Sequence, residues 1–362
     1  MKSFIRQEIA LPVGLLTLLF FKTIGSELLT EATPLGIYLP VSAALLAIVT
    51  WAIFSVVRHS DALAIKLGEP FGTLILTLSV ISLEVVMISS VMLTGDPNPV
   101  MARDTMFAVV MLVTNGLVGF TLLFGGWRYH TQSFNLDGVK SYLVAIIPLA
   151  LLCLVLPNFT RGGSMSSPMS WMLIIISILL YGIFLLIQTR SHSHFFVDSD
   201  HEDYEEHHGP LRSNVYHTIL LLAYLVVVIL LAKTLAVPIN FGVKIMAAPP
   251  ALGGFIVACI VLAPEAVGAI KAAFNNQLQR AMNLYFGSVL ATIALTVPAV
   301  LFIGAMLGQE VRLGLSAADM VLLVTTLMVC KVTFSSGRTN VLHGATHLVL
   351  FVVYLFLMFE HE

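Results

Sequence analysis

The chain has 362 residues, of which 58% are hydrophobic and 10% are charged, and its formal net charge is −2. A soluble globular protein carries roughly a quarter of charged residues, so this composition excludes that class and indicates a polytopic protein embedded in membrane lipid. The near-neutral charge also argues against a nucleic-acid partner.

Apolar segments long enough to cross a membrane recur along the whole chain. The first, 9–29, is predicted to be a retained helix and not a cleaved signal, because Lys22 and Glu27 interrupt its second half. Period-2 alternation is absent, so the segments are predicted to be helices and not strands of a barrel. The ten that follow are 36–57, 72–93, 104–126, 139–156, 169–189, 215–235, 250–274, 281–305, 317–335 and 340–359. The sequence therefore predicts an all-α polytopic membrane protein with about eleven transmembrane helices.

The positive residues are spread unequally over the connections. Twelve of the eighteen Lys and Arg residues fall in the N-terminus and in every second connection, and five fall on the other side. Because Lys and Arg are concentrated on the cytoplasmic side of a membrane, the N-terminus is predicted to be cytoplasmic. With eleven spans, the C-terminus is then periplasmic.

One connection is long. Residues 190–214 carry six acidic residues and five histidines, and the same charge count places them in the cytoplasm. This loop could bind metal or sense calcium or pH, but its spacing matches no compact ligand set, so a solvated linker is favoured. It divides the chain into an N-terminal helix (1–35) with a first five-helix repeat (36–189), and a second five-helix repeat (215–362).

Two carboxylates lie deep inside apolar segments. Glu84 and Glu265 each occupy the second helix of their set of five, and the two helices are predicted to run in opposite directions. This pattern is typical of the inverted repeats of secondary transporters, whose sites lie at the midplane between the repeats. We therefore expect Glu84 and Glu265 to meet and to bind a cation or protons. A structural ion pair with Lys271 or Lys22 is the alternative.

Further polar groups near these carboxylates suit a hard cation, which prefers oxygen ligands. The candidates on the same or neighbouring helices are Ser82, Asn115, Ser288 and Thr292. Burial and mutual repulsion favour protonated carboxylates when the cation is absent, so a site of this kind exchanges cations for protons. Ca²⁺, Na⁺ and K⁺ are all open as substrates.

Two histidines on the last segment, His343 and His347, share a helix face at i, i+4. They could relay protons or hydrogen-bond neighbouring helices, and the structural role is favoured. No nucleotide motif or phosphate-cradling glycine loop is present, so no cofactor is expected. Two rival functions are a passive cation channel and an intramembrane hydrolase that uses the two glutamates as acid and base. The chain has neither an HExxH motif nor a serine elbow, so it is not expected to be an enzyme.

Three stretches carry a family resemblance: "KLGEPFGTLILTLSVISLEVVMISSVM", "APEAVGAIKAAFNNQLQRAMNLYFGSVLATIALTVP" and "GRTNVLHGATHLVLF". They closely resemble the ChaA-type sodium/calcium–proton antiporters of the Ca²⁺:cation antiporter superfamily. The resemblance implies a bacterial inner-membrane antiporter with two inverted five-helix halves and an extra N-terminal helix. It also implies that one glutamate from each repeat forms the central site, which by motif are Glu84 and Glu265.

Some smaller motifs of this chain also match the superfamily, and others differ from it. Asn115 and Ser288 match polar positions of the two repeats. Where the vacuolar exchangers of the superfamily have Gly-Asn before the first glutamate, this chain has Val80 and Ile81, and Ala291 replaces a glutamine. The site is therefore expected to hold few amide oxygens, which weakens the expectation of calcium binding and keeps Na⁺ and K⁺ open.

Overall fold

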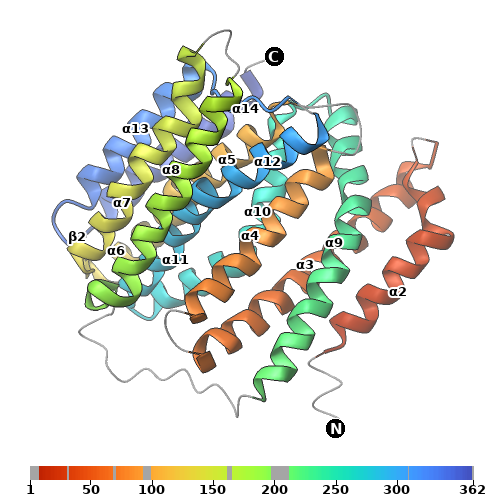
Figure 1. Cartoon of the computed structure of the whole chain (residues 1–362), viewed down its shortest axis with the longest axis horizontal. Coiled ribbons are helices and arrows are strands. Elements are labelled where there is room, and N and C mark those ends of the chain that lie inside the picture. The colour runs from red at the N-terminus through yellow and green to blue at the C-terminus, as the bar shows by residue number, and fades with distance from the viewer. Residues whose placement is uncertain are drawn as a thin grey trace. The chain divides into compact units, whose positions relative to one another are not determined.

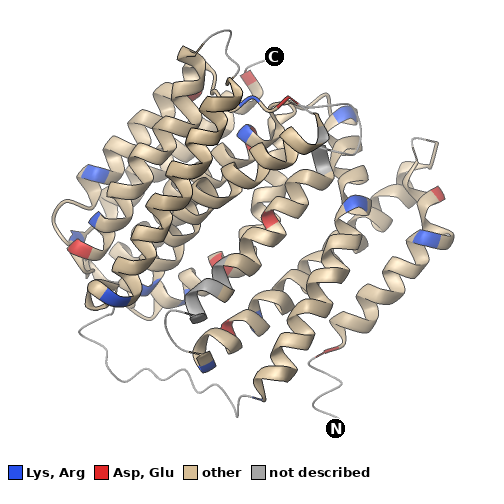
Figure 2. Cartoon of the chain, viewed as in Figure 1, with Lys and Arg blue, Asp and Glu red and all other residues tan. Residues whose placement is uncertain are grey.

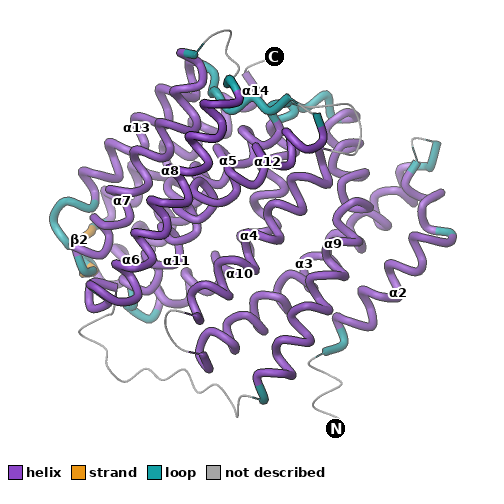
Figure 3. The backbone as a smooth tube through the Cα atoms, viewed as in Figure 1, coloured by secondary structure: helices purple, strands orange, loops and turns teal. Residues whose placement is uncertain are grey.

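The computed structural model describes residues 8–30, 32–67, 71–92, 99–160, 165–196, 212–308 and 310–360. Nearly all of them are helical, and the one sheet among them pairs β1 (Gln132–Ser133) with β2 (Arg338–Thr339) in antiparallel register (Figure 3). The α-helices are α2 (Ala10–Thr23), α3 (Leu35–Leu67), α4 (Phe71–Met92), α5 (Met101–Met111), α6 (Val118–Tyr129), α7 (Leu136–Ala150), α8 (Ser167–Leu186), α9 (Asn214–Ile245), α10 (Ala251–Phe274), α11 (Leu278–Ala291), α12 (Val297–Leu307), α13 (Ala317–Thr333) and α14 (Val341–Glu360) (Figure 1).

The helices coincide with the predicted apolar segments. Eight helices among the described residues are long and apolar enough to cross a membrane, so the predicted class of a multi-span all-α membrane protein is confirmed. Figure 2 shows long uncharged stretches of helix, as burial in lipid requires. The total of eleven crossings, the two five-helix repeats and the positions of the termini stay predictions.

Helices α3 and α9 are each ten residues longer at their C-terminal ends than the apolar pattern predicts, ending at Leu67 and Ile245. The apolar pattern ends at residues 57 and 235. A helix does not have to end there, because its backbone bonds continue equally well beyond the hydrocarbon layer.

The chain divides into two compact units that do not follow chain order. Unit 1 comprises 1–98 and 208–264, and unit 2 comprises 99–207 and 265–362. Each unit therefore combines helices from before and after the long connection. The last boundary falls inside α10, between Pro264 and Glu265. Residues 197–211, the acidic and histidine-rich part of that connection, lie outside the described residues.

Unit 1 is built on α3, which packs against α2, α4 and α9. A buried acidic group lies where these elements meet. Glu8, 8% exposed, precedes α2 and accepts hydrogen bonds from Arg58 at 2.7 Å, His59 at 3.2 Å, Tyr224 at 3.0 Å and Tyr216 at 2.8 Å. Two of these donors lie on α3 and two on α9, so one carboxylate ties the start of the N-terminal helix to both.

The carboxyl of Glu8 is stabilised in its charged form. Burial raises its pKa, but the hydrogen bond from Tyr216 and the guanidinium of Arg58 outweigh burial and lower the pKa from the usual 4.5. A group whose pKa is lowered by folding stabilises the fold above its unfolded pKa and loses that contribution as the pH falls through the folded value.

We therefore expect Glu8→Gln to lower the free energy of unfolding at pH 7 by about 1–3 kcal/mol, because hydrogen bonds to a charged acceptor are lost. The difference between the wild type and this variant should shrink as the pH falls below about 4. Apparent melting temperatures of the two proteins in detergent between pH 3.5 and 7 measure this, with the exposed Glu27→Gln as control. A difference that does not change with pH would contradict the assignment.

Unit 2 contains a close contact between two helices. Helices α6 and α14 meet through glycines: a Cβ at Gly344 would lie 2.3 Å from the backbone N of Leu123, and one at Gly119 would lie 2.9 Å from the backbone N of Leu348. Small residues let helix backbones approach in this way within a membrane, where lipid offers no hydrophobic force between helices. The same contact brings the face of α14 that carries His347 against α6.

Candidate functional site

Glu84 lies in unit 1, on α4, and is 3% exposed. Its own helix surrounds it with buried apolar side chains at the −4, −3, +3 and +4 positions, namely Val80, Ile81, Met87 and Ile88. Oxygen atoms that share a cation with Glu84 must therefore come from other elements. A carboxylate buried on such a face is costly, which is the usual mark of an ionisable group with a function.

Ser82 does not accompany Glu84. It is exposed, lies two residues away and so faces the other side of α4, and its hydroxyl donates to the carbonyl of Leu78 at 2.6 Å. Ser82 and Glu84 therefore lie on different faces of α4. The sequence pattern placed Ser82 beside Glu84 by proximity in the chain, which does not report the helix face.

Glu265 is half-buried and lies on α10, where it is the first residue that belongs to unit 2. Pro264 directly before it has no N–H, so the carbonyl of Ile260 one turn earlier lacks its intrahelical donor. A carbonyl of this kind is a ready oxygen ligand next to the carboxylate. Because Glu84 and Glu265 belong to different units, their meeting stays a prediction.

Asn115 is fully buried in a π-helical segment, η2 (Leu112–Leu117), that joins α5 to α6. Its Nδ2 donates to the hydroxyl of Thr326 at 2.8 Å, and its Oδ1 lies 3.1 Å from Nδ1 of His347. The amide oxygen is then the acceptor, so Nδ1 of His347 carries a proton. Nε2 of His347 lies 3.1 Å from the hydroxyl of Thr333. The structure thus brings two predicted site residues, Asn115 and His347, into direct contact.

This network contains two residues that the sequence pattern did not indicate. Thr326 and Thr333 lie on α13, and threonines on apolar helices usually hydrogen-bond their own backbone, so their spacing carries no signal. His343 lies one turn before His347 on α14 and is half-buried. The buried network therefore involves His347 and not the pair of histidines as a unit.

Ser288 and Thr292 lie one turn apart at the end of α11, in a region that mirrors the Asn115 segment. Thr292, 2% exposed, opens a second π-helical segment, η8 (Thr292–Thr296), and Ser288 is half-buried on the turn before it. Within unit 2, η2 packs against α11 and η8 packs against α5. Interruptions of this type leave backbone groups without regular helical partners and are frequent at functional sites. Each of the two π-helical segments therefore lies against the helix that precedes the other.

Among the described residues, no group of three or more His, Cys, Asp and Glu side chains is arranged to hold a metal ion. A transported ion does not need such a resident site. Carboxylates, hydroxyls and backbone carbonyls suit an ion that must bind and leave, since oxygen ligands coordinate Na⁺, K⁺ and Ca²⁺ without fixing one geometry.

Comparison with known proteins places these features in a family. The sodium/calcium exchanger protein family model matches residues 37–190 and 216–360. The sodium-potassium/proton antiporter ChaA of Escherichia coli (strain K12) is 49% identical over 311 residues, which cover 84% of this chain and 85% of that protein. The Ca²⁺/H⁺ antiporter ChaA of Bacillus subtilis (strain 168) is 24% identical over 245 residues, covering 66% and 69%.

A solved structure shows the same fold. The native YfkE structure has a TM-score of 0.73 and 20% sequence identity, and the match covers 98% of this chain and 99% of that one. The family match spans both sides of the long connection and includes the helices that carry Glu84, Asn115, Glu265 and Ser288. This chain therefore belongs to the sodium/calcium exchanger family, as a cation/proton antiporter of the ChaA type.

Proposed function

We propose that the chain exchanges Ca²⁺, Na⁺ or K⁺ for protons by alternating access, at a midplane site formed by Glu84 and Glu265. The observation that carries this proposal is the burial of Glu84 in the middle of an apolar helix, together with a second midspan carboxylate at Glu265. Both lie on helices that the family match covers. We place the chain in the bacterial inner membrane with a cytoplasmic N-terminus, on the distribution of Lys and Arg.

The exchange follows from charge balance. Two carboxylates without a cation repel each other and take up protons, whereas a bound cation favours their charged forms and expels protons. A site that holds either the cation or the protons, and never both, couples the two fluxes. When both carboxyl groups give up their protons, two protons leave for one divalent ion.

The surroundings of Glu84 favour a monovalent ion. Ca²⁺ takes roughly six to eight oxygen ligands, and a calcium site usually recruits amide and carboxylate oxygens for them. On α4 the positions next to Glu84 are the buried apolar side chains of Val80 and Ile81. The amide oxygen of Asn115 is engaged by His347. The E. coli relative is named for sodium, potassium and protons, which agrees with this preference.

Inverted membrane vesicles that carry a pH gradient test the proposal. Addition of Na⁺ or K⁺ should collapse the gradient, and Ca²⁺ should do so only at higher concentration. A cation gradient imposed without a pH gradient should in turn drive proton movement, which a passive channel cannot do in an electrically clamped vesicle. If no cation moves protons in either direction, the proposed function is wrong.

Substitutions can distinguish a structural role of His347 from a role in proton transfer. Glutamine can donate to Asn115 and accept from Thr333, but it cannot carry a proton between them. If His347 only supports Asn115, His347→Gln should retain most of the exchange, whereas His347→Leu should lower it about tenfold because it leaves buried polar partners unsatisfied. Exchange rates of both variants in vesicles measure this. An equal loss in both would instead assign His347 to proton transfer.

A further inference from the structure

The C-terminal half of α10, from Glu265 to Phe274, ends against the last residue of α6 and the segment that follows it. The last four carbonyls of a helix have no intrahelical donors. At the end of α10, backbone N–H groups of the following turn donate to the carbonyls of Lys271, Ala272 and Ala273. The hydroxyl of Tyr129 donates to the carbonyl of Phe274 at 2.6 Å, and Nε2 of Gln132 donates to the carbonyl of Ala273 at 3.2 Å. Two side chains from one neighbouring segment thus hold the end of the helix.

Gln132 is fixed at both its backbone and its side chain. Its backbone belongs to β1 and pairs with Thr339 of β2, and the residue is 2% exposed. Its amide donates a second hydrogen bond, to Oδ1 of Asn276 at 3.1 Å. Asn276 has a φ of 61°, the left-handed conformation that ends a helix, and asparagine tolerates it better than most residues. The turn after α10 is therefore held in one conformation.

The sequence around Gln132 makes room for this contact. A Cβ on Gly125 would lie 1.8 Å from Oε1 of Gln132, so a side chain at this position would displace the amide. Only glycine lets α6 approach the amide this closely. The second of the paired glycines in "LLFGGW" faces a different neighbour, Val341 of α14.

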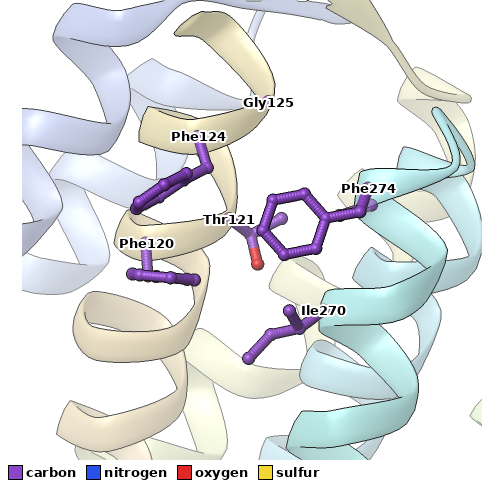
Figure 4. A pocket seen from close by; sticks show the side chains of 7 residues that line it. Phe120, Thr121, Phe124, Gly125, Ile270 and Phe274 are labelled. Atoms are coloured by element: carbon purple, nitrogen blue, oxygen red, sulfur yellow. The ribbon is translucent and has the colours of Figure 1, made fainter. Parts of the chain in front are cut away.

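Apolar side chains complete the attachment at the helix end and one turn before it. Figure 4 shows Phe274 and Ile270 of α10 facing Phe120 and Phe124 of α6 across a narrow apolar pocket. The rings of Phe124 and Phe274 meet edge to face, with centroids 6.0 Å apart. Edge-to-face packing of this kind has a preferred geometry, so it sets the rotation of α10 as well as its distance from α6.

We propose that Tyr129 and Gln132 are positioning residues for Glu265. This inference rests on the proposed function, in which Glu265 binds the cation and the protons. Pro264 removes one hydrogen bond between the start of this half-helix and the preceding turn. The position of the Glu265 carboxylate therefore depends more strongly on the contacts at the C-terminal end of α10. Glu265 lies nine residues before Phe274, about 14 Å along the axis, and a straight helix transmits a shift or rotation of its end over that length.

The test compares Tyr129→Phe and Gln132→Leu with wild type in the vesicle exchange assay, using whichever of Na⁺, K⁺ and Ca²⁺ the wild type transports. The cation concentration for half-maximal exchange should rise about three- to tenfold, the equivalent of one net hydrogen bond, while the maximal rate changes by less than about twofold. The pH at half-maximal exchange should shift in the same variants, because a displaced Glu265 competes differently for protons.

Tyr142→Phe is the matched control, because it removes a buried hydroxyl that accepts from Gln188 at 3.0 Å, in the same unit but away from α10. Its half-maximal concentration and pH profile should equal those of wild type. If Tyr129→Phe and Gln132→Leu also equal wild type, or if they lower only the maximal rate or the amount of folded protein, the positioning role is wrong.

A fourth variant, Glu265→Gln, separates this inference from the proposal on which it rests. Full exchange by Glu265→Gln overturns the proposed function itself. Loss of exchange in Glu265→Gln together with unchanged Tyr129→Phe and Gln132→Leu overturns only the positioning role. Gly125→Ala, which displaces the Gln132 amide without changing either donor, should reproduce the shift in half-maximal concentration.

Discussion

Glu84→Gln and Glu265→Gln should each lower cation-driven proton movement by at least about a hundredfold, the equivalent of about 2.7 kcal/mol of lost ion binding. Glutamine keeps the size of the side chain and one oxygen, but it can neither balance the charge of a cation nor release a proton. Because the exchange needs both properties at one site, we expect the two single variants to fail to the same extent. Collapse of a pH gradient in inverted vesicles measures the loss.

Glu310→Gln is the control for this experiment. It makes the same chemical change at an exposed carboxylate, whose side chain is 52% accessible and pairs with Arg312 at 2.9 Å. The Arg312 guanidinium lowers the pKa of Glu310, so Glu310 is charged at neutral pH. Glu310→Gln therefore removes one negative charge, as the two test variants do. Exchange should be unaffected. Normal exchange by both Glu84→Gln and Glu265→Gln would show that the buried carboxylates are structural.

A side chain at Gly344 should destabilise unit 2. The Cβ of alanine would lie 2.3 Å from the backbone N of Leu123 and 2.8 Å from the carbonyl O of Gly119, and backbone atoms cannot rotate away. Helices α6 and α14 must therefore separate. We expect Gly344→Ala to lower the free energy of unfolding by about 1–3 kcal/mol, as overpacking of a close contact does. Valine should do more harm and disturb the Asn115–His347 contact.

The apparent melting temperature in detergent, with size-exclusion profiles of the solubilised protein, measures this effect. Gly182→Ala is the matched control, because nothing lies within 4 Å of a Cβ at this position on α8. There alanine should stabilise the helix by up to about 1 kcal/mol, through its higher helix propensity. Equal melting temperatures for the two alanine variants would mean that α6 and α14 do not pack as closely as described.

The predicted helices were found because their signal is local. A run of about 20 apolar residues has few alternatives to a membrane-spanning helix, since every backbone group must be paired inside the segment. The position of Glu84 within α4 and that of Glu265 within α10 follow from the same reading. The resemblance to ChaA-type antiporters rests on short motifs, and the family match and the 49% identical relative confirm it.

The contacts of the candidate residues were decided by tertiary structure. Spacing placed Ser82 near Glu84, but the helix turns that hydroxyl to an exposed face. Cation binding by Asn115 stays a prediction, but only the structure shows that its amide contacts His347 and Thr326 from two other helices. The sequence gives no signal for the roles of Tyr129 and Gln132, because their partners are backbone carbonyls that lie more than 140 residues away in the chain.

By itself, the sequence determined that this protein crosses the membrane repeatedly, where its helices lie, that Glu84 and Glu265 lie within apolar helices, and which family it belongs to. Only the tertiary structure decided which helices touch, which polar groups pair, and where the units divide within α10. The physical reason is that lipid and apolar side chains are nearly equivalent surroundings. Hydrophobicity therefore places each helix in the membrane, but close packing and buried hydrogen bonds select its neighbours.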